Sequence, residues 1–404
     1  MPTVVLVGTL DTKGREFDFL RDRVREHGVE VLLVDCGIMG EPLAVPDITR
    51  DEVAAAVGAD VAALAAAGDR GAAVTVMAAG AAAIAVRLRA EGRLNGILSV
   101  GGSGNSAIAT QAMRALPVGV PKLMVSTVAS GDTRPFVGAV DIAMMYSVVD
   151  VAGVNRISAQ IMTNAAGMIA GAVRSTTPDL GADRLLIGAT MFGVTTACVT
   201  AARERLEELG YEVLVFHATG TGGQSMEALA KAGFLPGVLD ATTTELADEL
   251  VGGVLSAGSD RLEAAGALGL PQVVSLGALD MVNFGPRESV PEKFAGRNLY
   301  VHNPTITLMR TTPDECRELG RQIGRKLSAA TGPTVLYVPL RGVSAIAVEG
   351  QVFHDAEADT ALLEGLHETL AASIEVHELD TDVNDPTFAL AMANRLHELI
   401  KEQA

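Results

Sequence analysis

Short hydrophobic runs recur along the chain, and each is followed by glycine or polar residues and then by an amphipathic stretch. This alternation is typical of βαβ units, in which buried parallel strands are joined by helices. The runs predict strands at residues 3–8, 29–34, 95–100, 121–126, 184–189, 211–216, 271–276, 298–302 and 334–338. We therefore expect an α/β protein.

Helical periodicity fills most of the intervals between these runs. The predicted helices are residues 16–27, 51–67, 70–91, 104–115, 155–174, 195–209, 224–233, 244–251, 313–329, 357–372 and 386–402. Residues 70–91 also contain a strand-like segment, but Met77, Ala81, Ile84 and Leu88 would share one helical face. We therefore predict a single long helix there.

The same order of predicted elements begins at residue 4 and again at residue 185. Each opening has a buried strand, a Gly/Thr turn, a helix and a second strand that ends in a polar group. The repeat predicts two Rossmann-like domains, residues 1–178 and 179–404, with mainly parallel sheets, flanking helices and a cleft between the domains. Residues 176–179 are the predicted linker.

Composition narrows the class of protein. The net charge is −18 and no basic stretch occurs, which argues against a nucleic-acid partner. The three cysteines lack CxxC spacing, which favours a reducing compartment over a zinc cluster. No secretory signal is visible, and the most apolar run, residues 72–86, is too short to span a membrane. We expect a cytoplasmic protein that does not interact with membranes.

Polar strand ends in the first half form the first candidate site. Glycine, hydroxyl, carboxylate and ammonium groups follow the first strand, and a glycine-rich turn opens a helix after the third. Free amides at a helix start attract anions. The expected nucleotide-binding residues here are Gly8, Thr9, Asp11, Thr12, Lys13, Gly101, Gly102, Ser103, Gly104 and Asn105. The alternatives are ordinary strand-to-helix turns and a solvated Lys13.

Three further positions extend this candidate site. Asp35 ends the second strand, where a ribose-binding carboxylate is often found. Ser130 and Gly131 follow the fourth strand, and Asp132 adds a carboxylate that, with Asp11, would reach Mg²⁺. Neither a Walker A motif nor a GxGxxG fingerprint is present, so the motif itself does not identify the ligand.

Polar strand ends in the second half form another candidate site. A glycine-rich turn at residues 217–223 again points to a helix start, and a threonine run follows Asp240. His217, Asp280 and His302 are candidate catalytic residues, and Asn283 and Arg310 would lie nearby. Burying such groups unpaired costs several kcal/mol, about 2–7 for a polar group, which favours a site. The alternative for each histidine is a hydrogen-bonded structural role.

The motifs together resemble a known family of bacterial and fungal proteins. It is related to the ATP-binding N-terminal region of a plant tobamovirus-resistance protein. The resemblance lies at residues 8–14, 101–104, 125–131, 144–150, 155–158, 191–196, 216–220, 280–284 and 302–304. It implies two α/β domains, ATP binding in the N-terminal half and a homo-oligomer, either a dimer or a dimer of dimers. Asn105 departs from the glycine expected there, and its side chain would crowd a phosphate.

Three functional hypotheses follow. The first is a nucleotide-binding enzyme that uses ATP and Mg²⁺ and acts on a small anionic metabolite in the cleft. The second is a non-catalytic nucleotide sensor. The third is a lyase or hydrolase of small carboxylates that uses no nucleotide.

Overall fold

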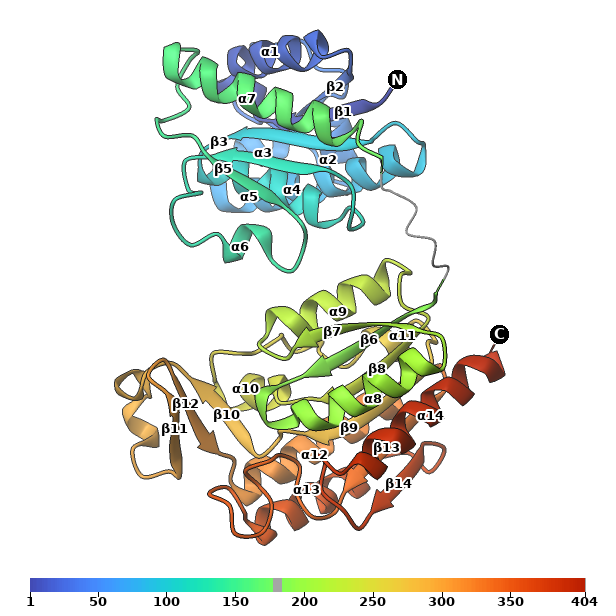
Figure 1. Cartoon of the computed structure of the whole chain (residues 1–404). Coiled ribbons are helices and arrows are strands. Elements are labelled where there is room, and N and C mark those ends of the chain that lie inside the picture. Colours follow the sequence, from blue (N-terminus) through green and yellow to red (C-terminus); the bar gives the residue numbers. More distant parts are fainter. Residues whose placement is uncertain (177–183, 404) are drawn as a thin grey trace. The chain divides into compact units, whose positions relative to one another are not determined.

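The chain folds into two compact units, Met1–Leu180 and Gly181–Ala404, which are described separately (Figure 1). The structure is a computed structural model that describes residues 1–176 and 184–403. Residues 177–179 of the predicted linker lie outside the described residues. Both units contain a parallel sheet flanked by helices, so the predicted α/β class with two Rossmann-like sheets is confirmed.

Unit 1 is built on a five-stranded parallel sheet with the order β2-β1-β3-β4-β5. Its strands are β1 (Thr3–Gly8), β2 (Glu30–Asp35), β3 (Gly96–Gly101), β4 (Lys122–Ser126) and β5 (Ala143–Tyr146). The chain steps from β1 to its neighbour β2 and then returns to β3 on the other side of β1. The order therefore reverses between β1 and β3, the position where open α/β sheets bind ligands.

Alternate strand residues of unit 1 enter two separate cores. Val4 and Leu6 pack against α1 (Leu10–Glu26) and α7 (Arg156–Ala172). Val5 and Val7 face the other side. The helices on that side are α2 (Arg50–Ala55), α4 (Arg70–Ala90) and α5 (Ser103–Arg114), and α3 (Val61–Ala67) contributes Val61. This period-two pattern is why the strand runs are continuously hydrophobic.

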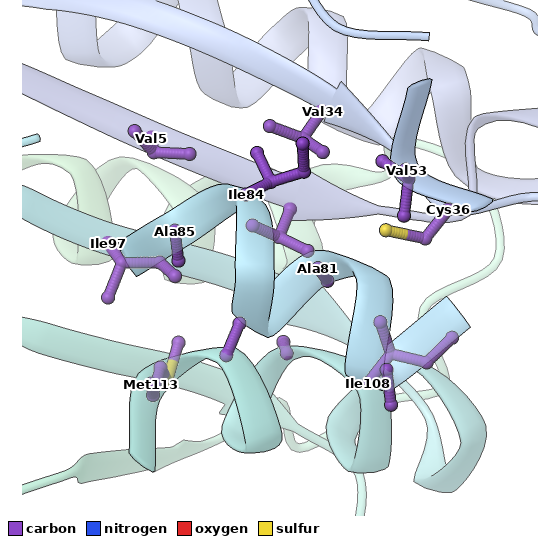
Figure 2. Close-up of a cluster of buried hydrophobic side chains, with 14 of the residues drawn as sticks. Val5, Val34, Cys36, Val53, Ala81, Ile84, Ala85, Ile97, Ile108 and Met113 are labelled. Carbon is purple, nitrogen blue, oxygen red and sulfur yellow. The ribbon is translucent and has the colours of Figure 1, made fainter. Parts of the chain in front are cut away.

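Helix α4 is the central packing element of that second face. Ala81, Ile84 and Ala85 lie between the strands and α5 in Figure 2. Within the described part of the chain, α4 is the one helix long and apolar enough to cross a membrane. Its apolar face is instead buried in unit 1, so we assign α4 to the protein core.

Two predictions for unit 1 were wrong in detail. Residues 51–67 form two helices, α2 and α3, because Gly58 adopts a positive φ of 71° and Asp60 caps a new helix start. Strand β5 was missed because its four residues are partly exposed and carry no clear period. A short helix, α6 (Arg134–Val137), precedes it.

Unit 2 contains a six-stranded parallel sheet with the order β14-β13-β9-β8-β6-β7. Its strands are β6 (Leu186–Met191), β7 (Glu212–His217), β8 (Gly237–Thr242), β9 (Gln272–Gly277), β13 (Thr334–Pro339) and β14 (Glu375–Leu379). The helices are α8 (Thr196–Glu208), α9 (Thr221–Lys231), α10 (Glu245–Val251), α11 (Ala264–Ala267), α12 (Pro313–Ser328), α13 (Ala356–Thr369) and α14 (Pro386–Gln403). Its first strands repeat the order of unit 1, with the reversal between β6 and β8.

A separate antiparallel sheet also belongs to unit 2. It has the order β10-β12-β11, with β10 (Met281–Phe284), β11 (Leu299–Asn303) and β12 (Ile306–Arg310). The sequence predicted only β11 of these three strands. Strands β8 and β14 of the parallel sheet were missed as well.

Candidate functional site

A cavity of about 540 Å³ opens at the carboxyl ends of β1 and β3 in unit 1. This is the point where the strand order reverses. Its polar lining residues are Thr9, Asp11, Thr12, Lys13, Asp69, Arg70, Ser103, Asn105 and Asp150, together with Gly37, Gly68, Gly102 and Gly104. We call it the unit 1 cavity. It brings together the predicted groups that follow β1 and β3.

Three helices begin at this cavity. The first turns of α1, α4 and α5 supply Asp11, Arg70 and Ser103 to its lining. Each helix has at least 12 residues, so each presents the positive end of a full helix dipole. The positive ends of three helix dipoles therefore meet at a cavity that also holds the side chains of Asp11, Asp69 and Asp150, in a chain whose net charge is −18.

The starts of α1 and α5 differ from the starts of four other helices in unit 1. Helices α2, α3, α4 and α7 each have an N-cap side chain that accepts a hydrogen bond from the first turn. Helices α1 and α5 have no such side-chain cap. A missing cap leaves backbone amides to be satisfied by water or a ligand.

The free amides are concentrated at α5. In the part of unit 1 that the structure describes, no hydrogen bond is donated by the amides of Ser103, Gly104 or Asn105. At α1, in contrast, the Leu10 amide donates to Asp35 Oδ1 at 3.0 Å. The start of α5 is therefore the stronger candidate for binding an anion.

The glycines around the cavity fall into two classes. A Cβ at Gly8 would lie 2.0 Å from the ring of Phe17, and one at Gly101 would lie 2.8 Å from Asn105. Packing within unit 1 therefore requires these two. A Cβ at Gly102 or Gly104 would meet nothing closer than 3.7 Å and 3.5 Å, respectively, and neither glycine has a positive φ. The protein fold does not need glycine at these two positions, whereas a ligand against the backbone would.

Two cations line the cavity. The Lys13 ammonium donates to the carbonyl of Val151, which holds the half-buried side chain at the start of α1. Arg70 is exposed at the start of α4. Arg70 was not predicted as a site residue, because its only local signal is the preceding Asp69, which caps α4 by accepting from the Ala72 amide.

Asp11 is held in place by backbone donors. Its Oδ2 accepts hydrogen bonds from the amides of Ile38 at 3.1 Å and Met39 at 2.9 Å. Its Oδ1 is buried and has no hydrogen-bond partner among the described residues. The neighbouring hydroxyls of Thr9 and Thr12 lie 3.0 Å apart.

The side chain of Asn105 does not crowd the amides at the start of α5. It turns towards β3, where Nδ2 donates to Ser99 Oγ and to the Val100 carbonyl, both at 2.9 Å. The side chain is buried, so Asn105 offers the cavity mainly its backbone amide.

Asp35 is committed to the fold of unit 1. Its Oδ1 accepts from the amides of Leu10 and Gly37, and its Oδ2 accepts from Arg50 Nε at 2.9 Å. It is 1% exposed and does not line the cavity. A ribose hydroxyl would have to displace one of these partners, so we do not carry Asp35 into the proposed site.

The segment after β4 also lies outside the cavity lining. Ser130, Gly131 and Asp132 are absent from it, and Asp132 pairs with Arg134 at 2.8 Å. Hydrogen bonds from Arg134 lower the pKa of Asp132 to about 2. Within the described residues, no group of three or more His, Cys, Asp or Glu side chains is arranged to hold a metal.

The predicted catalytic residues of unit 2 lie on different elements. His217 ends β7 and its ring packs edge-on against Phe192. His302 lies on the exposed strand β11 beside Tyr300. No hydrogen bond among the described residues joins either histidine to Asp280, and their catalytic role stays a prediction.

Asp280 is a buried residue after β9. Ser344 Oγ donates to its Oδ2 at 2.8 Å, and its Oδ1 has no hydrogen-bond partner in the described part of the chain. Burial raises the pKa of Asp280 to about 6, although the charge of Arg310 opposes this rise. Asn283 is engaged separately, donating from Nδ2 to Asp248 at 2.7 Å.

The glycine-rich turn of unit 2 is filled by the protein itself. Glu245 Oε1 accepts from the amides of Gly220 at 2.7 Å and Gly223 at 3.0 Å. Arg261 binds Glu245 Oε2 at 2.6 Å and also forms a two-bond ion pair with Asp240. A carboxylate of the chain therefore occupies the position that an anionic ligand would take at the start of α9.

Known proteins resemble this chain along its whole length. The model of the Uncharacterised protein family (UPF0261) N-terminal domain matches residues 2–178, and that of its C-terminal domain matches residues 184–400. A UPF0261 protein of Clostridium tetani is 53% identical over 99% of both chains. The ToMV resistance protein Tm-1(GCR237) of Solanum lycopersicum is 38% identical over 98% of this chain and 56% of its own.

Solved structures give a much weaker likeness. A UDP-N-acetylglucosamine 2-epimerase from Rickettsia bellii is 10% identical over 68% of this chain and 78% of its own, with a TM-score of 0.24. A likeness at that level carries no argument about function. The matches to both family models confirm the resemblance seen in the motifs: the chain belongs to the two-domain UPF0261 family.

Proposed function

We propose that unit 1 binds a nucleoside phosphate, with ATP as the representative ligand, in the unit 1 cavity. The observation that carries the proposal is the convergence of three helix N-termini, of which α5 has free amides, on one cavity that Lys13 and Arg70 also line. Amides and helix dipoles bind phosphate without any net positive charge on the protein.

An apolar wall favours a nucleotide over a small carboxylate. Leu64, Val74, Met77 and Ile108 line the cavity together with the polar groups named above. Ligand sites commonly combine such a wall with a few fixed polar groups. The base of a nucleotide would cover these apolar side chains, whereas a small carboxylate would leave them exposed to water. We therefore favour nucleotide binding over the hypothesis of a lyase or hydrolase of small carboxylates.

The residues present also suit Mg²⁺ when a phosphate is bound. Asp11 Oδ1 is a carboxylate oxygen without a hydrogen-bond partner among the described residues, and Asp11 lines the cavity. Magnesium is usually bound by one or two carboxylates, phosphate oxygens and water. We propose Asp11 as the protein ligand, and the ion would neutralise phosphate charge. Asp132 is left out because it pairs with Arg134.

Thermal unfolding tests the binding proposal. A ligand that binds only the folded state raises stability by mass action, by about 2.7 kcal/mol at a concentration 100 times its dissociation constant. We expect ATP with Mg²⁺ to raise the melting temperature, and adenosine alone to have a much smaller effect. No shift at millimolar ATP would reject the proposal.

Phosphate release separates an enzyme from a sensor. An enzyme that acts with the unit 2 candidates would release phosphate from ATP, and His217→Ala or His302→Ala would reduce that rate. A sensor would bind ATP without turnover. Turnover that survives both substitutions would remove these histidines from the catalytic proposal.

Assembly and location complete the proposal. Val154, Ile157 and Met168, which we call the α7 patch, are between 42% and 53% exposed, and Ile157 and Met168 lie on one face of α7. Exposed apolar groups of this kind favour a subunit interface, and we propose a homodimer.

Cys36, Cys198 and Cys316 are free and buried, which suits a reducing cytoplasm.

A further inference from the structure

Arg70 lies beside the amino-terminal end of α5 without an acidic partner. A Cβ built on Gly104 would be 3.5 Å from Arg70 Nη2, so the guanidinium is close to the free amides of α5. Arg70 is exposed and lines the unit 1 cavity. In the part of the chain that the structure describes, Arg70 makes neither an ion pair nor a side-chain hydrogen bond.

This position is electrostatically unfavourable in the absence of a ligand. Arg70 is the first residue of α4, where a positive charge opposes the dipole of its own helix. It also faces the positive end of the α5 dipole. An anion between the guanidinium and the α5 amides would be attracted by both, and these attractions would offset the two repulsive interactions.

The two cations of the cavity differ in their exposure to solvent. The half-buried Lys13 ammonium is tied to the Val151 carbonyl at the start of α1. Arg70 is exposed to solvent. A ligand with several phosphates would therefore meet Lys13 at an inner group and Arg70 at its outermost group.

We infer that Arg70 is a specificity-determining residue, which binds the outermost phosphate and makes the cavity prefer polyphosphate ligands to monophosphates. This inference rests on the proposed function. A guanidinium can form two parallel hydrogen bonds to one phosphate, whereas an ammonium acts as a point charge. We therefore expect Arg70→Lys to keep part of the preference for polyphosphates and Arg70→Ala to lose it.

Titration calorimetry with ATP, ADP and AMP, each with Mg²⁺, tests this role. In Arg70→Ala we expect ATP affinity to fall about tenfold or more, because a charge-assisted hydrogen bond is lost. AMP affinity should stay within about twofold, because AMP lacks the outer phosphates. The ratio of ATP to AMP affinity is the readout, and a general structural defect would not change it.

Arg156→Ala is the matched control. Arg156 is the first residue of α7, is exposed, and does not line the cavity. Arg156→Ala removes the same charge from an equivalent helix position but not from the cavity. Its ratio of ATP to AMP affinity should therefore equal that of the wild type. Equal losses for all three nucleotides in Arg70→Ala, or no loss, would overturn the role of Arg70 and leave the proposed function standing. A wild type that binds none of them would overturn both.

Discussion

Glycines near the cavity differ in whether the packing of the protein explains them. Gly104 lies in the first turn of α5, and the fold leaves room there for a Cβ. The proposed close approach of a phosphate would give a physical reason for glycine at this position. The same reasoning applies to Gly102, whereas Gly8 and Gly101 are explained by packing.

Gly104→Ala should separate ligand binding from stability. Alanine is favoured over glycine in a helix by up to about 1 kcal/mol, so the unliganded protein should be as stable as the wild type or more stable. The new methyl group lies against the amides, so ATP affinity should fall about tenfold or more. Calorimetry and thermal unfolding measure the two effects.

Gly171→Ala is the control for this substitution. Gly171 lies in α7, and a Cβ there would meet nothing within 4 Å. It should retain wild-type ATP affinity. If Gly104→Ala bound ATP as tightly as Gly171→Ala does, phosphate binding at the start of α5 would be wrong.

Asp280 predicts a pH dependence of stability in unit 2. Burial raises its pKa from an ordinary 3.8 to about 6, so the folded protein holds this proton more tightly than the unfolded chain. Its contribution to stability is complete below about pH 4 and is lost as the pH rises to about 6, at roughly 1.4 kcal/mol per pKa unit. We expect a loss of about 2–3 kcal/mol relative to a variant with a neutral side chain.

Asp280→Asn supplies that neutral side chain. Its amide oxygen can still accept from Ser344, and Arg310 and Asp359 are unchanged. Urea unfolding between pH 4.5 and 7.5 should show the wild type losing stability relative to Asp280→Asn as the pH rises. Parallel pH profiles would show that Asp280 is already ionised in the fold.

At the scale of elements, the same glycine-rich turn has two different uses. In unit 1 the start of α5 keeps free amides, whereas in unit 2 the start of α9 is filled by Glu245. Arg261 then compensates for the buried charges of Glu245 and Asp240. This network fixes the turn after β7 and leaves no anion site there.

Arg261→Ala should strongly destabilise unit 2. The substitution leaves three buried carboxylates, those of Glu227, Asp240 and Glu245, without their cation. Breaking a buried ion pair typically costs about 3–5 kcal/mol. Arg325→Ala is the control, because Arg325 pairs with Glu318 on the surface and should cost at most about 1 kcal/mol. Urea unfolding measures both, and similar small losses would contradict the role given to Arg261.

The sequence predicted those elements whose pattern is local. Strands such as β1 and β3 are buried on both faces and read as continuous apolar runs. Strand β8 was missed because Asp240 interrupts its apolar run. The buried carboxylate of Asp240 is stabilised by Thr190 and Arg261, which are distant from it in the sequence. The short edge strand β5 lacks a clear pattern because it is partly exposed.

The candidate site was likewise predictable only where its residues follow predicted strands. Residues that follow β1 and β3 could be found because strand order alone brings them together at one edge. Arg70 could not, because it reaches the cavity from the start of α4 through tertiary packing. Asp35 ends a strand as predicted, but its partners Leu10, Gly37 and Arg50 are not evident from local sequence.

At the scale of the whole molecule, the α7 patch predicts self-association. Replacing Met168, which is 53% exposed, with glutamate places a charge in the proposed interface. Light scattering should show a wild-type dimer and a Met168→Glu monomer. Val86→Glu is the control, because Val86 is similarly exposed at 48% but lies on α4. A monomeric wild type would contradict the proposed homodimer.

Phosphate binding by the amides at the start of α5 is the proposal on which the others depend. A crystal of the protein grown with ATP and Mg²⁺ tests it directly. We expect density for a phosphate within about 3 Å of the amide nitrogens of Ser103 and Gly104, with Lys13 and Arg70 beside it. Density for ATP elsewhere, or amides closed off by the protein's own side chains as at Gly220 and Gly223, would contradict the account.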